Sequence, residues 1–157
     1  MNHNNLKNYI PNKTVNIKGI LNWFEVAIPE PKDKDVCVQV GVHLEECAEM
    51  LHALGLGSAS RNLHSYADMF KRSDRKAMYC IEKADKVELL DSIADQIVTG
   101  VGTGHMLGMD IEGALKEVND SNHSKFEYGK AVFDEQGKIS KGKNYRSPEL
   151  EPFIGNN

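Results

Sequence analysis

The chain has 157 residues, with 23 Asp or Glu against 19 Lys or Arg and a formal net charge of −4. Its length suits one domain with its own core, and its composition is typical of a globular protein rather than a disordered or fibrous one. The acidic balance argues against a general nucleic-acid binder, which carries a basic excess. A small phosphorylated ligand, bound through local cations or a metal ion, stays compatible with that charge.

The cysteine pattern and the N-terminal composition indicate the cellular compartment in which we expect the protein. Cys37, Cys47 and Cys80 form no C-x-x-C pair, so we expect no disulfide framework and a cytoplasmic protein. Residues 1–16 are rich in Asn and Lys, lack the apolar segment of a secretory signal, and are expected to be loose. No stretch approaches the roughly 18 to 20 apolar residues of a membrane span. Residues 17–157 are expected to form a single domain.

The first half of the chain predicts two helices. A short apolar patch around Trp23 precedes a proline-containing connector. From about Asp35 to Leu54, apolar residues recur every three or four positions, which is the spacing of one helix face. Gly55 and Gly57 are expected to end this helix. Ser58 or Ser60 is expected to cap a second helix, and the polar run 71–76 is interpreted as a connection.

The second half predicts two more helices and an irregular end. A long apolar stripe favours a helix from about Asp85 to Leu107, and Asp110 is placed to cap the next helix. After Lys125 the chain becomes glycine-rich with short alternating segments, which indicates a small hairpin or an extended arm from about residue 126. The sequence therefore predicts an all-α fold, a four- to five-helix bundle with an irregular C-terminal arm.

Acidic residues gather on one side of two of these helices. The E-E-x-x-E string comprises Glu45, Glu46 and Glu49, and the second group comprises Glu88, Asp91 and Asp95. At about 100° per residue, each group forms a single stripe. Like charges at this spacing repel by roughly 0.2–0.5 kcal/mol per pair, and several carboxylates on one face suit a hard divalent cation. Each stripe also lies opposite an apolar face, so a solvated surface is the alternative for either one.

These motifs resemble those of a known superfamily. E-E-x-x-E on one helix and E-x-x-D at Glu88 and Asp91 on another are similar to the signature of the all-α nucleoside triphosphate pyrophosphohydrolases. This MazG-like superfamily includes dimeric dUTPases and phosphoribosyl-ATP pyrophosphohydrolase. Segments 117–125 (ending N-H-S-K) and 141–145 (K-G-K-N-Y) resemble its Cof-like branch. The resemblance runs from about residue 23 to 152, with an apparent extra segment at 64–83.

The resemblance implies an activity and a set of site residues. The activity is hydrolysis of a nucleoside or deoxynucleoside triphosphate between its α and β phosphates, with Mg²⁺, or Mn²⁺ in its place, as cofactor. The implied metal ligands are Glu46, Glu49, Glu88 and Asp91, and the catalytic pair is Glu45 and Glu46, where Glu45 is a ligand or a general base. Asp95 would support the metal ligands. The implied substrate-binding residues are Asn122, Lys125, Lys143, Asn144 and Tyr145. Relatives assemble as homodimers or dimers of dimers.

Three points stay open on the sequence alone. Trp23 and Phe24 belong either to a base pocket or to the core. The chain could be a non-catalytic nucleotide-binding or helical interaction module that keeps the fold without turnover. A ferritin-like di-iron bundle is the less favoured reading, because Glu49 and His52 form one E-x-x-H pair and the chain lacks a clear second.

Overall fold

The computed structural model describes residues 17–135 and 137–155, and within them it is all-α, as the sequence predicts. The predicted loose segment 1–16 lies outside the described residues. The helices are α1 (Ile17–Ala27), α2 (Asp33–Ala53), α3 (Gly57–Lys71), α4 (Arg75–Lys83), α5 (Lys86–Met106), α6 (Ile111–His123) and the short 3-10 helix η1 (Glu151–Phe153). None of the described helices is long and apolar enough to cross a lipid bilayer.

Two of the six helices were not predicted. The apolar patch around Trp23 is the inner face of α1, and Trp23 and Ala27 are buried one turn apart. The region 71–76, interpreted as a connection, contains the start of α4, where the Asp74 carboxylate accepts a hydrogen bond of 2.9 Å from the Ala77 N–H. The predicted serine cap of α3 is wrong. This helix begins at Gly57 without a side-chain cap, and Ser60 is buried inside it.

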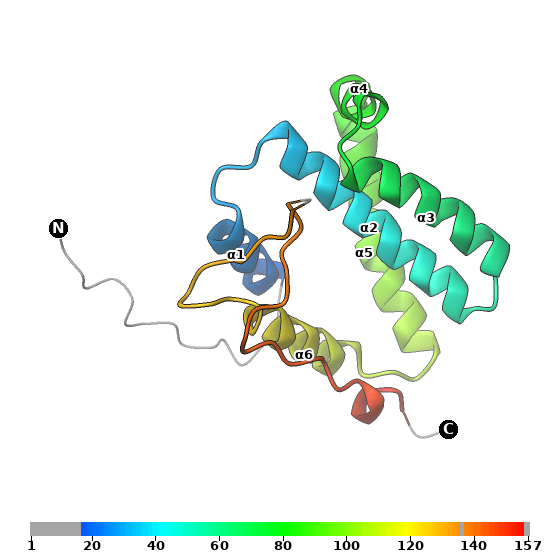
Figure 1. Cartoon of the computed structure of the whole chain (residues 1–157). Helices are drawn as coiled ribbons and strands as arrows, with labels where there is room; N and C mark the ends of the chain where they lie inside the picture. The colour runs from blue at the N-terminus through cyan, green and yellow to red at the C-terminus, as the bar shows by residue number, and fades with distance from the viewer. Residues whose placement is uncertain (1–16, 136, 156–157) are drawn as a thin grey trace.

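Helices α2 and α3 form an antiparallel pair that is held close by small residues (Figure 1). Ala48 on α2 and Ala67 on α3 are fully buried. A Cβ atom added to Gly41 would lie 2.7 Å from both the carbonyl oxygen of Ala67 and the backbone nitrogen of Lys71. Glycine is therefore required at position 41 for this approach. The close packing brings Lys71 of α3 over the acidic segment of α2.

Helix α5 runs in the same direction as α2, behind it in Figure 1. Near their first turns, Val36 of α2 and Lys86 of α5 line one cavity. Farther along, His43 Nε2 lies 2.7 Å from Gln96 Oε1. Gln96 Oε1 also lies 3.9 Å from Cys47 Sγ, so the two helices meet through the Gln96 side chain, while no Cα atom of α5 lies within 8 Å of one in α2.

The outer face of α5 leaves a row of large apolar side chains exposed. Their exposed fractions run from 40% to 80%, and they are Val87, Leu89, Leu90, Ile93, Ile97, Val98 and Val101. Monomeric proteins rarely expose a contiguous apolar stripe of this length. This face of α5 therefore has the character of an interface.

The C-terminal arm folds back over α1 and along α6 (Figure 1). It contains two isolated antiparallel bridges, between Glu127 and Lys130 and between Phe133 and Ile139, rather than a regular hairpin. Farther along, the Ser121 hydroxyl of α6 donates to the carbonyl oxygen of Arg146 at 2.8 Å. The arm closes one side of a cavity against α1 and α2.

Candidate functional site

A cavity of about 410 Å³ lies between α1, α2, α6 and the arm. Its apolar wall comprises Trp23, Phe24, Ile28, Val38, Val42, Val118 and Ile139. Its polar side comprises Asp35, Gln39 and Glu46 of α2, Asn122 of α6, and Lys125 and Lys138 of the segment after α6. The structure thus brings together the predicted residues Glu46, Asn122 and Lys125. Two ammonium groups and two carboxylates beside an apolar wall can hold, together with a cation, an anionic ligand that carries an aromatic group.

The carboxyl group of Glu46 is surrounded by other charged groups. Burial raises its pKa, and the neighbouring carboxylates of Glu49 and Glu45 raise it further, while Lys138 and Lys125 oppose them. Repulsion among carboxylates that lie close together is relieved by a bound cation. Glu46 thus interacts with both other acids of the motif.

Glu45, the third acid of the motif, is already engaged. Its Oε1 accepts a hydrogen bond of 2.7 Å from Lys71 Nζ, and its Oε2 accepts one of 2.9 Å from Lys138 Nζ. Burial acts to raise the pKa of Glu45, but the hydrogen bonds from these two lysines outweigh it, and the pKa is lowered. A carboxylate with a lowered pKa and both oxygens bound is a weak general base.

Lys125 lies at the end of α6 and faces the same cavity. Burial lowers the pKa of its ammonium group, and the charges of Lys138 and Lys141 act in the same direction. Lys125 forms no ion pair within residues 17–135 and 137–155. An ammonium group among other cations, without a paired carboxylate, is a favourable position for a phosphate oxygen.

The K-G-K-N-Y segment shapes the arm rather than the cavity. Lys143, Asn144 and Tyr145 are not among the residues that line the cavity. Instead, the Lys143 N–H donates to Glu127 Oε1 at 2.7 Å, and the Lys141 ammonium lies 4.7 Å from the centre of the Tyr145 ring. A Cβ atom at Gly142 would lie 2.6 Å from the Lys125 carbonyl oxygen, so the glycine allows the arm to pack against the residue that follows α6.

The acids of α5 lie on a helix whose backbone stays away from that of α2 within one chain. No Cα atom of α5 lies within 8 Å of one in α2. The helices meet through the Gln96 side chain, whose Oε1 lies 2.7 Å from His43 Nε2 and 3.9 Å from Cys47 Sγ. Glu88 precedes Gln96 by eight residues, about 12 Å at about 1.5 Å per residue, and Glu88, Asp91 and Asp95 are all exposed. Among the described residues, no group of three or more His, Cys, Asp or Glu could hold a metal ion.

Trp23 is both a core residue and a wall of the cavity. It is 6% exposed, and its ring stacks on Phe126 with a centroid distance of 5.5 Å and an angle of 10°. Its buried Nε1–H has no acceptor among the described residues. A buried donor without a partner costs about 1–3 kcal/mol, which a ligand with a suitably placed acceptor would recover.

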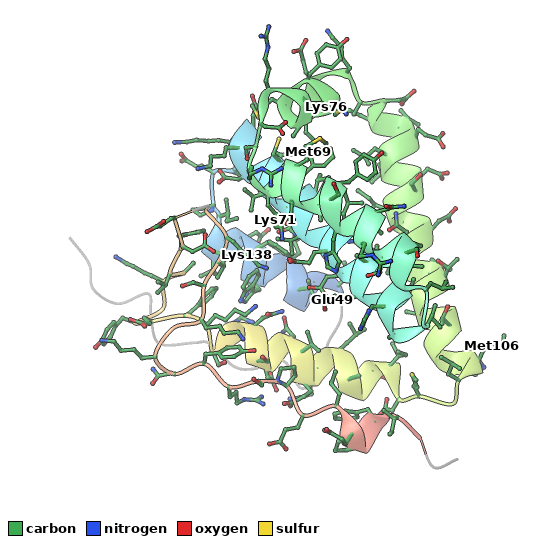
Figure 2. The ribbon with its side chains drawn as sticks, turned by 45° about the vertical axis from the view of Figure 1, so that its right-hand side comes forward. Glu49, Met69, Lys71, Lys76, Met106 and Lys138 are labelled. Atoms are coloured by element: carbon green, nitrogen blue, oxygen red, sulfur yellow. The ribbon has the colours of Figure 1, made fainter. Side chains whose placement is uncertain are left out.

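Two functional candidates carried no signal in the sequence. Lys71 and Lys138 belong to none of the recognised motifs, yet both reach Glu45, and Lys138 does so across 93 residues of chain. Figure 2 shows the two lysine side chains next to each other, where the arm passes over α2. Only the packing of α3 and of the arm on α2 identifies them.

The arm is tied to α6 by Glu117, the first residue of the segment 117–125. Its carboxylate accepts hydrogen bonds from the Arg146 guanidinium and, at 3.2 Å, from the Glu149 N–H. These bonds, the one from Arg146 foremost, lower the pKa of Glu117. The contact therefore stabilises the arm when Glu117 is ionised.

Lowering the pH is expected to release this end of the arm. Because the folded pKa of Glu117 lies below that of a free glutamate, about 4.3, its contribution is present above that value and is lost as the pH falls through the folded pKa. Glu117→Gln should show the released state already at pH 7. Limited proteolysis of the arm measures both effects. Glu112→Gln, an exposed position on the same helix, is the matched control, and equal protection of Glu117→Gln and the control would contradict the expectation.

Comparison with protein-family models, with curated proteins and with solved structures returned no match to this chain. The similarity to the MazG-like superfamily rests on the sequence motifs and stays a prediction.

Proposed function

We propose that the protein is a nucleoside triphosphate pyrophosphohydrolase, which works in the cytoplasm with Mg²⁺ or Mn²⁺. The single observation that carries this proposal is the cavity that Glu46, Lys125 and Lys138 line beside an apolar wall that includes Trp23 and Phe24. In the reaction, a water oxygen bonds to the α-phosphorus as the bond to the α–β bridging oxygen breaks. The products are a nucleoside monophosphate, pyrophosphate and a proton released to solvent.

Glu46 and Glu49 are the proposed Mg²⁺ ligands. Their pattern fits the ion, because Mg²⁺ is usually bound through one or two carboxylates, substrate phosphates and several waters. The crowding of carboxylates that raises the pKa of Glu46 supports this assignment. The bound ion would neutralise the triphosphate and activate the attacking water. Lys125 would bind a phosphate oxygen, and Asn122, which lines the same cavity, a polar edge of the sugar.

The apolar wall is the proposed base subsite. Trp23 and Phe24 offer ring surface, and the Trp23 Nε1–H offers one donor to a carbonyl oxygen or ring nitrogen of a base. A purine or pyrimidine supplies such an acceptor on its edge. This donor is a reason to expect discrimination among bases, since a misplaced acceptor would leave the N–H unpaired.

We propose further that the chain works as a homodimer, alone or within a dimer of dimers. The exposed apolar face of α5 favours association, because its row of aliphatic side chains would be covered by a second copy. The motif resemblance assigns Glu88 and Asp91 to the metal site, yet within one chain no Cα atom of α5 lies within 8 Å of one in α2. A second copy is the proposed source of these two carboxylates.

A panel of nucleoside and deoxynucleoside triphosphates with Mg²⁺ tests the function. We expect at least one of them to yield equimolar monophosphate and pyrophosphate. If no triphosphate releases pyrophosphate, the enzyme proposal fails. Stabilisation of the chain against heat by a nucleotide, without turnover, would instead favour the non-catalytic nucleotide-binding module.

A further inference from the structure

The contact among Glu45, Lys71 and Lys138 joins three parts of the chain at the edge of the cavity. One carboxylate of α2 binds an ammonium group of α3 with one oxygen, at 2.7 Å, and an ammonium group of the arm with the other, at 2.9 Å. The side chains of Glu45 and Lys71 are 19% and 14% exposed, and that of Lys138 is 41% exposed. The arm end of this contact is thus the accessible one.

Lys138 is the less enclosed of the two lysines that bind Glu45. Lys71 is also bound by Asp68, at 3.1 Å, so its charge is met by two carboxylates, whereas Glu45 is the one carboxylate that pairs with Lys138 in this cluster. Lys138 lines the cavity together with Lys125, which has no ion pair within the described part of the chain. The carboxylates of Asp35 and Glu46 line the same cavity, so a cation bound to carboxylate there would leave the two ammonium groups to meet a ligand with several negative charges.

The position of the two lysines relative to Glu46 indicates which part of such a ligand they meet. Glu46 and both lysines line the same cavity, and Glu46 interacts electrostatically with each of them. A metal ion on Glu46 and Glu49 would hold the phosphate chain beside Lys125 and Lys138. The base subsite around Trp23 is apolar, so the lysines face the charged end of the nucleotide.

We propose that Lys138 binds the phosphate oxygens of the leaving pyrophosphate group, and that Glu45 and Lys71 are positioning residues that hold the arm so that Lys138 faces the cavity. This inference rests on the proposed function and deepens it. It also gives Glu45 a role different from that of a metal ligand or general base.

Calorimetric titration of the full chain with inorganic pyrophosphate in the presence of Mg²⁺ tests the inference without turnover. Lys138→Met should raise the pyrophosphate Kd about 10-fold, as expected for the loss of one charge-assisted hydrogen bond. Lys138→Arg should bind within about three-fold of wild type, because it keeps a cation. Lys130→Met removes an exposed lysine of the same arm and should bind like wild type. Binding of a nucleoside monophosphate should be unchanged in all three.

The Glu45→Gln variant tests whether Glu45 acts by positioning Lys138 or by contacting pyrophosphate itself. It should weaken pyrophosphate binding less than Lys138→Met does, and the double variant should bind no more weakly than Lys138→Met alone, because the two residues act through one contact. Lys71→Met should act in the same direction as Glu45→Gln.

Several outcomes would overturn the inference, and they differ from a failure of the proposed function. Wild-type binding of pyrophosphate by Lys138→Met, or no pyrophosphate binding by the wild type, would overturn it. An equal loss of monophosphate binding would also do so, since that would indicate general damage to the cavity. If Lys138 variants weaken pyrophosphate binding as expected while no triphosphate is hydrolysed, the Lys138 site stands and only the proposed activity fails.

Discussion

Replacing Glu49 by glutamine is expected to lower the rate of pyrophosphate release at least about 100-fold, which corresponds to about 2.7 kcal/mol of transition-state stabilisation. Glutamine keeps the size of the side chain and removes the negative charge that would bind Mg²⁺. Glu49 belongs to the crowded carboxylate group that raises the pKa of Glu46, and it forms no ion pair among the described residues. Its loss should therefore reduce metal binding without breaking an internal contact.

Two controls make this prediction specific to the metal site. Glu25→Gln, an exposed acid on α1, should keep wild-type activity. A chelator should abolish the activity of the wild type, and added Mg²⁺ should restore it. Because Glu49→Gln leaves the fold intact, its melting temperature without metal should match that of the wild type. Full activity of Glu49→Gln would show that the carboxylate stripe of α2 is an ordinary surface.

Mixing two inactive variants is expected to restore about one quarter of the wild-type activity if two copies share each site. Glu49→Gln damages the α2 side of a site, and Glu88→Gln damages the α5 side. In a mixed dimer, one site combines both damaged helices and the other combines both intact helices. With random pairing, about half of the dimers are mixed, and each has one working site of two.

The same experiment distinguishes a shared site from a site within one chain. If Glu49 and Glu88 of the same chain acted together, every site in the mixture would lack one carboxylate and no activity would return. Full activity of Glu88→Gln alone would show that Glu88 of α5 does not contribute to the site. The variants should be co-expressed with different tags so that mixed dimers can be purified, and light scattering should confirm two chains per particle.

The helices illustrate how far local sequence information reaches. The starts of α5 and α6 follow from side chains within four residues, because Asp85 accepts hydrogen bonds from the N–H groups of Val87 and Glu88, and Asp110 from that of Gly113. The same logic applies to Asp74 at α4, although the surrounding polar residues concealed that helix. By contrast, the start of α3 could not be predicted, because the helix begins without a side-chain cap and Ser60 is buried inside it.

The candidate site also combines features that local sequence determines with features that only tertiary contacts determine. The sequence by itself determined the all-α class, the approximate bounds of α2 and α5, the start of α6 and the two acidic stripes, because caps and the helical repeat depend on residues a few positions apart. Only the tertiary structure placed Glu46 and Lys125 at one cavity, engaged Glu45 with Lys71 and Lys138, and kept the Cα atoms of α5 more than 8 Å from those of α2. These features depend on the close approach at Gly41, the direction of α5 and the path of the arm. Such contacts join residues far apart in the chain, and their spacing in the sequence carries no trace of them.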